Sequence, residues 1–324
     1  MPLTPVIRFG DARCELREGE SVLDGLLRQG VPVAHACRAG SCGSCMLRAV
    51  EGEIPAAAQA GLKDSWKAGG YFLACICRPE GPLTVAEAGS DARVAATISS
   101  LGKLAADVLR VGLTCTAQFP YRAGQYLTLI RDSGLARSYS IASLPEEAEL
   151  ELHVRLIPGG RMSGWLAHEA RLGDKVVLQG PSGECFYVSG REDQPVVLIG
   201  TGTGLAPLRG IVRDALRAGH RGPLRLFHGA RTVDGLYLRE ELAALAAAHA
   251  NFTYVPTVLD GDGAAGVDVG PIDRIVAGQL PGLGGWRGFV CGDPALVQNL
   301  KRKLFLSGMA LNDICADAFL PAAL

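Results

Sequence analysis

Residues 37–45 of this 324-residue chain read Cys37-Arg38-Ala39-Gly40-Ser41-Cys42-Gly43-Ser44-Cys45. A further cysteine, Cys75, follows at a distance. Three thiolates in a C-x4-C-x2-C pattern, completed by a distant fourth, are the ligand set of one type of 2Fe–2S cluster. The spacing therefore predicts a cluster held by Cys37, Cys42, Cys45 and one distant cysteine near residue 75, and a small domain built around that loop.

Zinc and unrelated thiols are the alternatives to a cluster. Structural zinc sites usually pair two short C-x2–4-C motifs, whereas here three cysteines crowd one loop and the fourth is distant. That asymmetry favours the cluster. Gly40 and Gly43 can adopt positive φ and bring backbone N–H groups to the cluster sulfurs. Arg38 would offset part of the cluster's negative charge.

The fourth ligand is ambiguous, because Leu73-Ala74-Cys75-Ile76-Cys77 offers two cysteines that would share one face of an extended segment. The first 90 residues resemble the plant-type ferredoxin domain of bacterial reductases, whose closing motif is similar to Leu-Ala-Cys. The resemblance favours Cys75 over Cys77. The scattered cysteines are expected to be buried structural thiols; they are Cys14, Cys115, Cys185 and Cys315.

Composition excludes several classes of protein. Hydrophobic residues make up 48% of the chain, which is enough for ordinary cores. The net charge of −1 argues against nucleic acid as a partner. No apolar run is long enough to span a membrane, and the N-terminus lacks a signal-peptide pattern. We expect a cytoplasmic monomer, in which ten cysteines indicate metal ligation or redox chemistry before disulfides.

The pattern of elements changes twice along the chain, which predicts a multidomain α+β and α/β protein. Residues 1–90 fit a β-grasp domain, with strands at 4–9, 12–17 and 82–85, a helix at 22–28 and a linker at 86–92. Residues 93–190 fit an antiparallel β-barrel with one short helix near 163–168. Its expected strands lie near 94–101, 104–110, 125–130, 137–142, 149–156 and 176–179.

Residues 191–324 alternate strands and helices, which predicts a doubly wound parallel sheet. The apolar run Val196–Ile199 is typical of a strand buried on both faces. The expected strands lie at 196–199, 224–228, 252–258 and 289–291, and the expected helices at 208–216, 238–249, 272–277 and 294–306.

The middle region carries two motifs that suit a flavin. Arg137-Ser138-Tyr139-Ser140 lies on a predicted strand, and Gly159-Gly160-Arg161-Met162-Ser163 leads into the short helix. A glycine turn at a helix N-terminus presents free N–H groups to phosphate oxygens. For Met162, ordinary barrel packing is an equally good interpretation.

These motifs resemble the flavin-binding barrel of the ferredoxin–NADP reductase superfamily. The resemblance implies that Arg137 grips a flavin phosphate, that Tyr139 packs on the isoalloxazine, and that Ser140 hydrogen-bonds near its reactive nitrogen. It implies pyrophosphate donors at Gly160, Met162 and Ser163. Ser138 belongs to the same flavin-holding element. FAD is favoured over FMN, because relatives with an N-terminal ferredoxin domain usually carry FAD.

A glycine-rich loop follows the buried strand and opens the next helix, with the order Gly200-Thr201-Gly202-Thr203-Gly204-Leu205-Ala206-Pro207. Such a loop lets a pyrophosphate approach the backbone, and proline suits the first helical turn. The loop resembles the nicotinamide half of the same superfamily. So do two further strings, Gly229-Ala230-Arg231 and Cys291-Gly292-Asp293-Pro294.

The resemblance implies dinucleotide contacts at Gly202, Thr203, Gly204, Pro207, Arg231 and Gly292, with Cys291 beside the nicotinamide ring. Ser140 and Cys291 are thus the candidate catalytic residues, although Cys291 can also be read as an ordinary buried strand residue. NADH is preferred over NADPH, because only Arg231 is basic after the second strand and Asp234 follows it. Phe319 either covers the isoalloxazine or packs at the sheet edge.

As a whole the chain resembles the reductase component of bacterial multicomponent oxygenases. The resemblance implies an electron path from NADH through FAD and the 2Fe–2S cluster to a protein acceptor, either an oxygenase component or an intermediate ferredoxin. Two alternatives are a reductase for a deoxysugar dehydratase and a redox-sensing binding module. In the reductase interpretation, the surface near residues 38–44 would determine which protein partner binds.

Overall fold

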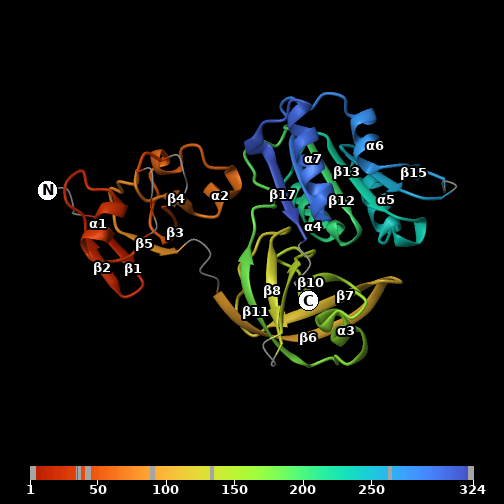
Figure 1. Ribbon diagram of the computed structural model, residues 1–324, viewed down its shortest axis with the longest axis horizontal. Coiled ribbons are helices and arrows are strands. Elements are labelled where there is room, and N and C mark those ends of the chain that lie inside the picture. Colours follow the sequence, from red (N-terminus) through yellow and green to blue (C-terminus); the bar gives the residue numbers. More distant parts are fainter. Residues whose placement is uncertain are drawn as a thin grey trace. The chain divides into compact units, whose positions relative to one another are not determined.

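The computed structural model describes residues 5–33, 35, 38–40, 45–87, 92–131, 135–261 and 265–319. The chain divides into two compact units, Met1–Ser90 and Asp91–Leu324. The first unit holds a five-stranded sheet, and the second holds two six-stranded sheets. Figure 1 labels most of the elements of each unit.

The first unit is a mixed sheet in the order β2-β1-β5-β3-β4, as expected for a β-grasp domain. Strand β1 (Val6–Phe9) runs antiparallel to β2 (Ala12–Glu15) and parallel to the central strand β5 (Leu83–Glu87). Helix α1 (Val22–Arg28) begins at Ser21, whose hydroxyl accepts the Asp24 N–H at 3.1 Å. The sequence patterns did not predict β3 (Met46–Glu51), α2 (Asp64–Ala68) and β4 (Tyr71–Leu73).

The first sheet of the second unit is the predicted antiparallel barrel, in the order β10-β7-β6-β11-β8-β9. An isolated bridge between Ile141 and Leu152 connects the two ends of this order. Its strands are β6 (Ala92–Ala105), β7 (Val108–Cys115), β8 (Tyr126–Ile130), β9 (Ala136–Ser140), β10 (Leu150–Arg155) and β11 (Lys175–Ser182). The short helix is α3 (Arg161–His168).

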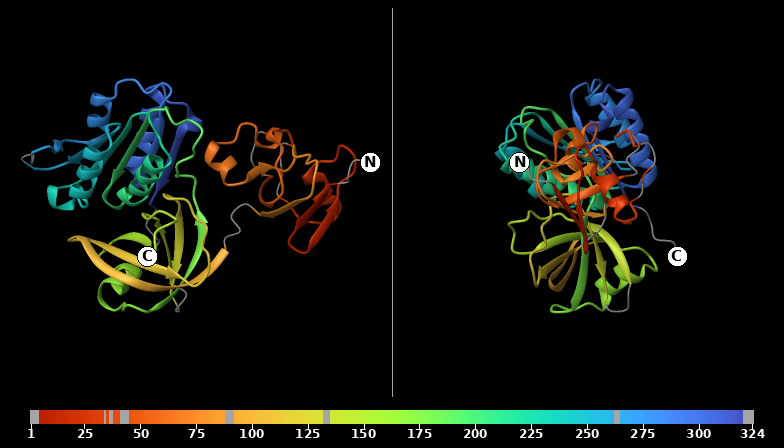
Figure 2. Two further views of the ribbon diagram at one scale, coloured as in Figure 1. Left: turned by 180° about the vertical axis from the view of Figure 1, so that it is seen from behind. Right: turned by 90° about the vertical axis from the view of Figure 1, so that its left-hand side faces the viewer.

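The prediction of separate strands at 94–101 and 104–110 was wrong. Strand β6 continues without a break to Ala105, and the chain turns only at residues 106–107. Two register shifts against β7, between Ile98 and Ser100 and between Lys103 and Ala105, let the long strand bend without ending. The β6–β7 hairpin is visible in Figures 1 and 2.

The second sheet of this unit is entirely parallel, in the order β15-β14-β13-β12-β16-β17. Helices α4 and α5 contribute to the apolar core on one face, and α6 and α7 to the core on the other. Alternate residues of β12 divide between these cores: Val196 and Leu198 belong to one, Val197 and Ile199 to the other. This is the predicted doubly wound sheet.

Four strands and four helices of the parallel sheet lie close to their predicted positions, whereas the two edge strands, β15 and β17, were not predicted. The strands are β12 (Val196–Thr201), β13 (Leu224–Ala230), β14 (Phe252–Val258), β15 (Asp268–Val269), β16 (Arg287–Gly292) and β17 (Ile314–Ala318). The helices are α4 (Leu205–Arg217), α5 (Arg239–Ala248), α6 (Ile272–Gln279) and α7 (Pro294–Leu306). In the part of the chain that the structure describes, no helix combines the length and apolarity that crossing a bilayer requires.

Candidate functional site

Cys45 and Cys75 meet in the first unit, as the cluster prediction requires. Cys45 lies just before β3 and Cys75 just after β4, and both are buried. The backbone N–H and the side chain of Cys75 both hydrogen-bond the Cys45 sulfur. Two sulfurs this close fit ligands of one metal centre. Cys37 and Cys42 lie outside the described residues, so no group of three ligands is found among the residues that are described.

Cys77, the alternative fourth ligand, belongs to the same apolar core as Cys45 and Cys75. Its side chain is fully buried in the apolar core of the unit. Burial raises the pKa of Cys77 to about 12, so the thiol keeps its proton. Burial also raises the pKa of Cys45, so this shift does not separate the two candidates, whereas the hydrogen bonds of Cys75 to the Cys45 sulfur do. The geometry supports Cys75, and the assignment stays a prediction.

The part of the cysteine loop that is described has a constrained backbone. Arg38 has a φ of 54°, in the left-handed region that is uncommon for a residue other than glycine. Its guanidinium pairs with Asp24 of α1 at 3.1 Å. Gly40 has a φ of 74°, and a Cβ at this position would lie 2.7 Å from the Ile76 side chain. The positive φ favours glycine here, and the loop lies close to Ile76, the residue after Cys75.

The predicted flavin motif occupies β9, where Leu129 is opposite Arg137 and Leu127 is opposite Tyr139. Tyr139 is partly buried against the barrel core, and burial raises its pKa. Arg137 donates to the Ala136 carbonyl at 2.7 Å. Ser138 lies on the other face of the strand, where its hydroxyl is 3.2 Å from that of Thr128. Ser140 ends the strand and is buried.

The second flavin motif opens α3. Gly160 is the N-cap, and a Cβ there would lie 2.6 Å from the Ser163 hydroxyl and 2.9 Å from the Ile157 carbonyl. The Ser163 hydroxyl accepts the Ile157 N–H at 3.2 Å, which closes the turn. The Met162 side chain is buried in the barrel core, as its packing interpretation expects. A phosphate contact from Met162 could come only from its backbone N–H.

The glycine loop after β12 forms a short 3₁₀ turn, Gly202–Gly204, that leads into α4 with Pro207 in the first helical turn. A Cβ on Gly204 would lie 2.3 Å from the Cys291 carbonyl oxygen. Gly292 has a φ of 130°, and a Cβ there would lie 3.0 Å from the Thr201 hydroxyl. The loop and the Cys291-Gly292 string thus meet at the carboxyl ends of β12 and β16, where the strand order reverses.

A cavity of about 660 Å³ lies at this edge of the sheet. Its size suits a nucleotide. Thr201, Gly202 and the residues that follow β13 line it, and the β6–β7 turn and Arg155 of the barrel close one side. A Cβ on Gly202 would lie 3.0 Å from the Arg155 guanidinium, which itself pairs with Asp107 at 3.0 Å. Two features therefore suit a dinucleotide here. Glycines such as Gly202 leave room for its backbone, and the Arg155 guanidinium lies beside them.

The rim of this cavity bears on cofactor choice. Arg231 pairs with Asp260 at 3.1 Å, and its side chain is 83% exposed. Arg231 and Asp234 both line the cavity. A 2′-phosphate would therefore meet a guanidinium that is already paired and a second carboxylate.

Ser140 and Cys291, the two predicted catalytic residues, approach a shared neighbour, Asp317 of β17. The Ser140 hydroxyl donates to Asp317 Oδ2 at 3.3 Å. Asp317 pairs with Cys291 in the strand register. Burial raises the pKa of Asp317, although the Ser140 hydrogen bond opposes the shift. The barrel and the parallel sheet therefore meet at the two residues that the flavin and nicotinamide motifs supply.

A second thiol also contacts Cys291. Cys185, which follows β11, is buried and hydrogen-bonds the Cys291 sulfur. Burial raises the pKa of Cys291, so a proton stays on its sulfur. Cys14 and Cys315 are buried as expected, whereas Cys115 is only partly buried. Sequence reasoning missed Asp317, Cys185 and Arg155 as site residues, because no local motif marks them.

Phe319 follows β17, and its N–H donates to the Gly292 carbonyl at 2.8 Å. Its ring is partly buried against the core cluster that contains Cys291 and Cys315. The residue therefore packs at the edge of the sheet beside the Cys291-Gly292 string. A role over the flavin stays a prediction.

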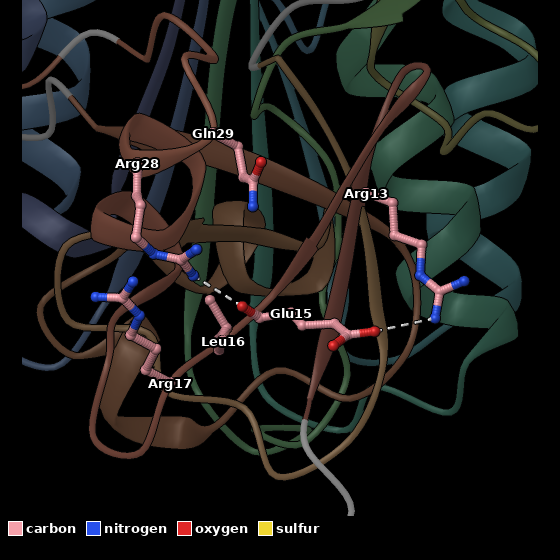
Figure 3. Close-up of a pocket in the computed structure, with 6 residues that line it drawn as sticks. All are labelled: Arg13, Glu15, Leu16, Arg17, Arg28 and Gln29. Atoms are coloured by element: carbon pink, nitrogen blue, oxygen red, sulfur yellow. Dashed lines mark hydrogen bonds and ion pairs between the residues drawn. The ribbon is translucent and has the colours of Figure 1, made fainter.

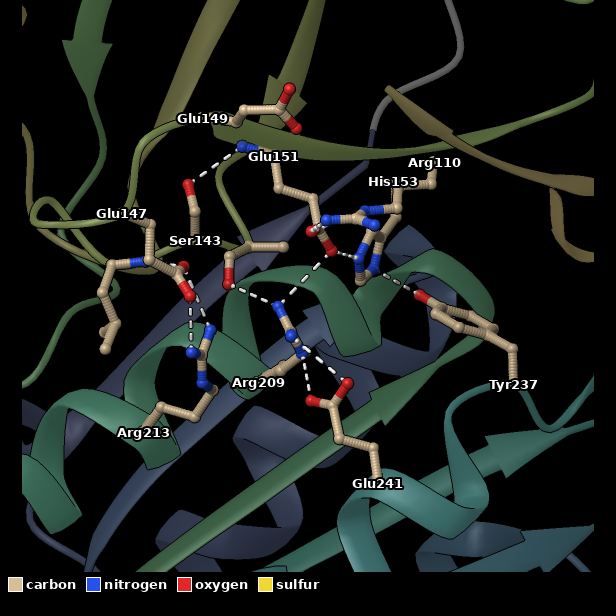
Figure 4. A network of polar contacts seen from close by, with 12 residues as sticks. Arg110, Ser143, Glu147, Glu149, Glu151, His153, Arg209, Arg213, Tyr237 and Glu241 are labelled. Carbon is tan, nitrogen blue, oxygen red and sulfur yellow. Dashed lines mark hydrogen bonds and ion pairs between the residues drawn. The ribbon is translucent and has the colours of Figure 1, made fainter. Parts of the chain in front are cut away.

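A buried polar network joins the barrel to the parallel sheet (Figure 4). Glu151 of β10 receives hydrogen bonds from His153 at 2.9 Å, Arg110 at 2.7 Å and Arg209 at 3.4 Å. His153 Nδ1 lies 3.0 Å from the Tyr237 hydroxyl. Burial lowers the pKa of His153, so the neutral imidazole donates from Nε2 to Glu151 and accepts from Tyr237.

We expect this network to make the second unit sensitive to acid. Burial alone would raise the pKa of Glu151, but the hydrogen bond from His153 and the charge of Arg209 lower it to about 2. A carboxyl whose folded pKa is lowered stabilises the fold above its unfolded pKa, about 4.3, and loses that contribution as the pH falls through about 2. The full contribution is about 3 kcal/mol.

The comparison of wild type with Glu151→Gln measures this contribution. Between pH 5 and pH 2 the free energy of unfolding should fall about 3 kcal/mol further in wild type than in the variant, measured by urea titration. Equal acid losses in the two proteins would show that Glu151 is not ionised within the network.

A second hollow, of about 430 Å³, lies on the first unit and is polar (Figure 3). Arg13, Glu15, Arg17 and Arg28 line it. Arg28 is already bonded to Glu20 at 2.8 Å and to the Glu15 carbonyl at 2.8 Å. Neither Cys45 nor Cys75, the two predicted cluster ligands that the structure describes, lines this hollow, and we assign it no function.

Comparison with protein families divides the chain in the same order as the motifs. A 2Fe-2S iron-sulfur cluster binding domain matches residues 10–80. An oxidoreductase FAD-binding domain matches residues 97–187, and an oxidoreductase NAD-binding domain matches residues 198–302. These matches confirm the three predicted cofactors, a 2Fe–2S cluster, FAD and NAD.

Several relatives match over nearly their whole length. The reductase component of the naphthalene 1,2-dioxygenase/salicylate 5-hydroxylase systems of Ralstonia is 33% identical over 94% of each chain. The reductase subunit of an aromatic O-demethylase from Amycolatopsis is 35% identical over 99% of this chain and 100% of its own. Among solved structures, the Amycolatopsis cytochrome P450 reductase GcoB is 33% identical, with a TM-score of 0.69 over 99% of this chain and 100% of its own.

Proposed function

This chain belongs to the family of ferredoxin–NAD(P)+ reductase components of oxygenase systems, and on that premise we propose that it passes electrons from NADH to an oxygenase that acts on aromatic compounds. The relatives reported above serve naphthalene, salicylate and aromatic O-demethylation systems. That shared chemistry carries the proposal. The cytoplasm, whose reducing conditions keep thiolate ligands available, is the location that this role implies, and we take the chain to act as a monomer.

When bound, FAD accepts a hydride from NADH and the 2Fe–2S cluster passes on single electrons. The chain's own residues supply position. Gly202, Thr203 and Gly204, with Pro207 in the first turn of α4, leave the backbone open to a dinucleotide pyrophosphate. Arg137, Tyr139, Gly160 and Ser163 would hold FAD in the barrel. Ser140 and Cys291 then flank the place where the two ring systems meet.

The exit of electrons is assigned to the cysteine loop. Cys37, Cys42, Cys45 and Cys75 are proposed as the cluster ligands. Arg38 is half-exposed beside the loop, where its charge can meet a partner surface. The loop rather than the nucleotide cavity would then set partner specificity.

Two artificial electron acceptors test the proposed electron path. The purified protein, loaded with FAD and cluster, should reduce both ferricyanide and cytochrome c with NADH. Ferricyanide that stays oxidised would contradict the reductase function, and would leave room for a redox-sensing module without NADH turnover. Reconstitution with candidate oxygenases, a cytochrome P450 among them because of the GcoB likeness, would then identify the partner.

We expect NADH to be preferred over NADPH. Arg231 is paired with Asp260, and Asp234 adds a carboxylate to the cavity. In the double variant Asp234→Asn/Asp260→Asn, Arg231 is free to meet a 2′-phosphate, and kcat/KM with NADPH should rise about tenfold. The value with NADH should change little.

Asp193→Asn is the matched control, since Asp193 forms an exposed pair with Arg221 at 2.8 Å before β12, away from the cavity. This variant should leave kcat/KM unchanged with both NADH and NADPH. Wild-type protein that uses NADPH as well as NADH would show that the rim of the cavity does not set the preference.

A further inference from the structure

We propose that Arg209 is a positioning residue for hydride transfer, because it fixes the nucleotide-binding helix α4 to the end of the flavin-binding strand. The inference rests on the proposed function and concerns a side chain that no motif marks. Arg209 touches neither predicted cofactor site directly. It acts through the backbone at the end of each one.

The Arg209 side chain is 10% exposed and bridges three segments (Figure 4). Its Nη1 donates to the Ala142 carbonyl at 3.2 Å and to Glu151 at 3.4 Å, both in the barrel. Its Nε and Nη2 donate to the two carboxylate oxygens of Glu241 in α5, at 2.6 and 3.3 Å. One planar guanidinium therefore links the barrel to two helices of the parallel-sheet region.

The segments that Arg209 joins carry the two predicted reactive ends. Ala142 lies two residues beyond Ser140, the last residue of β9. Arg209 lies two residues beyond Pro207, in the first part of α4 after the Gly202–Gly204 turn. The bridge therefore connects the end of the flavin strand to the start of the dinucleotide helix over a few residues on each side.

The helix and the barrel contact each other beside Arg209 through glycines, so no long side chain lies between the two backbones to absorb a displacement. A Cβ on Gly210 would lie 3.2 Å from the Ala123 side chain and 3.4 Å from the Ala142 carbonyl. A Cβ on Gly124 would lie 2.5 Å from the Ile211 side chain. The helix and the barrel thus approach almost backbone to backbone beside Arg209. A change in the bridge would displace α4 as a rigid element relative to β9.

Two further arginines on the same face of α4 provide an internal comparison. Arg213 pairs with Glu147 at 2.6 Å, and Arg217 pairs with Glu146. Exposure of the three arginine side chains rises along the helix, from 10% at Arg209 to 23% and 48%. Arg213 and Arg217 pair with the loop after residue 142, farther from the predicted ring contact. They are expected to add stability without setting the reactive geometry.

The distance between reacting groups controls hydride transfer steeply, and a displacement of about 1 Å can cost about 10²-fold in rate. Loss of the Arg209 bridge should therefore slow hydride transfer more than it weakens binding. The glycine loop that would hold the dinucleotide pyrophosphate is unchanged in such a variant. A purely structural role for Arg209 would instead lower stability and FAD content together.

Rapid-mixing measurements of flavin reduction by NADH under anaerobic conditions test the proposal. The variants are Arg209→Lys and Arg209→Met/Glu151→Gln. The first keeps a buried positive charge, and the second removes the positive charge of Arg209 together with the negative charge of Glu151. Arg213→Met is the control. FAD content, melting temperature, the Kd of NAD+ and the long-wavelength absorbance of the nicotinamide–flavin complex are measured for each protein.

Both Arg209 variants should reduce the flavin about 10²-fold more slowly than the control, with a nearly unchanged Kd for NAD+. Their nicotinamide–flavin absorbance should be weaker, and the isotope effect with 4-deuterated NADH larger. Rates and absorbance equal to those of Arg213→Met in either variant would overturn the proposal. If the double variant does not fold, Arg209→Lys alone decides. Wild-type protein that fails to reduce its flavin would contradict the proposed function instead.

Discussion

The Cys75→Ala variant will lose the 2Fe–2S cluster, and its NADH-driven reduction of cytochrome c will fall to background, while Cys77→Ala will keep both. Alanine cannot ligate iron, so the substitution removes one of four thiolates. Ferricyanide accepts electrons from the flavin site, so its reduction should continue in both variants. The visible absorbance of the cluster and the rates of ferricyanide and cytochrome c reduction check the prediction.

The contrast between these neighbouring cysteines rests on their surroundings. Cys75 reaches the Cys45 sulfur through both its backbone N–H and its side chain. Cys77 is fully buried two residues further along, and the cysteine that hydrogen-bonds the Cys45 sulfur is Cys75. Removing the Cys77 sulfur should cost packing only, which would show as a slightly lower melting temperature. Cluster loss in Cys77→Ala with a retained cluster in Cys75→Ala would reverse the assignment.

The cofactor motifs could be predicted because each is local in sequence. The Cys37–Cys45 loop, the β9 motif at Arg137 and the turn at Gly202 each place their chemistry within a few residues. The helix at 294–306 was predicted at its observed bounds, and the structure shows a local cause for its start: Asp293 caps it and Pro294 occupies its first position. Signals of this kind depend only on residues that are close in sequence, so contacts formed elsewhere in the fold do not alter them.

The residues that complete the candidate site could not be predicted, because their proposed role depends on contacts far apart in sequence. Asp317 matters only because β17 lies beside β16 and faces Ser140 from another sheet. Arg209 reads as one more charged residue on an amphipathic helix until its bonds to Ala142 and Glu241 are seen. The prediction of a break between two strands near residue 102 was wrong for a related reason. Pairing with β7, bulges included, outweighed a local glycine.

Gly204→Ala will lower kcat/KM for NADH by about 10²-fold and leave the cluster intact. The added Cβ would lie 2.3 Å from the Cys291 carbonyl oxygen and 2.8 Å from its carbonyl carbon, so backbone atoms must move. Either the Gly202–Gly204 turn or the Cys291-Gly292 string shifts, and both are proposed to hold the dinucleotide. A shift of about 1 Å at a reacting centre suffices for a loss of this size.

Gly278→Ala in α6 is the matched control, because a Cβ there meets no atom within 4 Å and the residue lies in a helix. That variant should keep wild-type kinetics and gain about 0.5–1 kcal/mol in stability. Cytochrome c reduction with NADH, and the cluster absorbance of both variants, complete the comparison. If Gly204→Ala bound and oxidised NADH like wild type, the contact between the turn and Cys291 would have no part in holding the dinucleotide. The glycine at 204 would then serve only to let β12 and β16 end side by side.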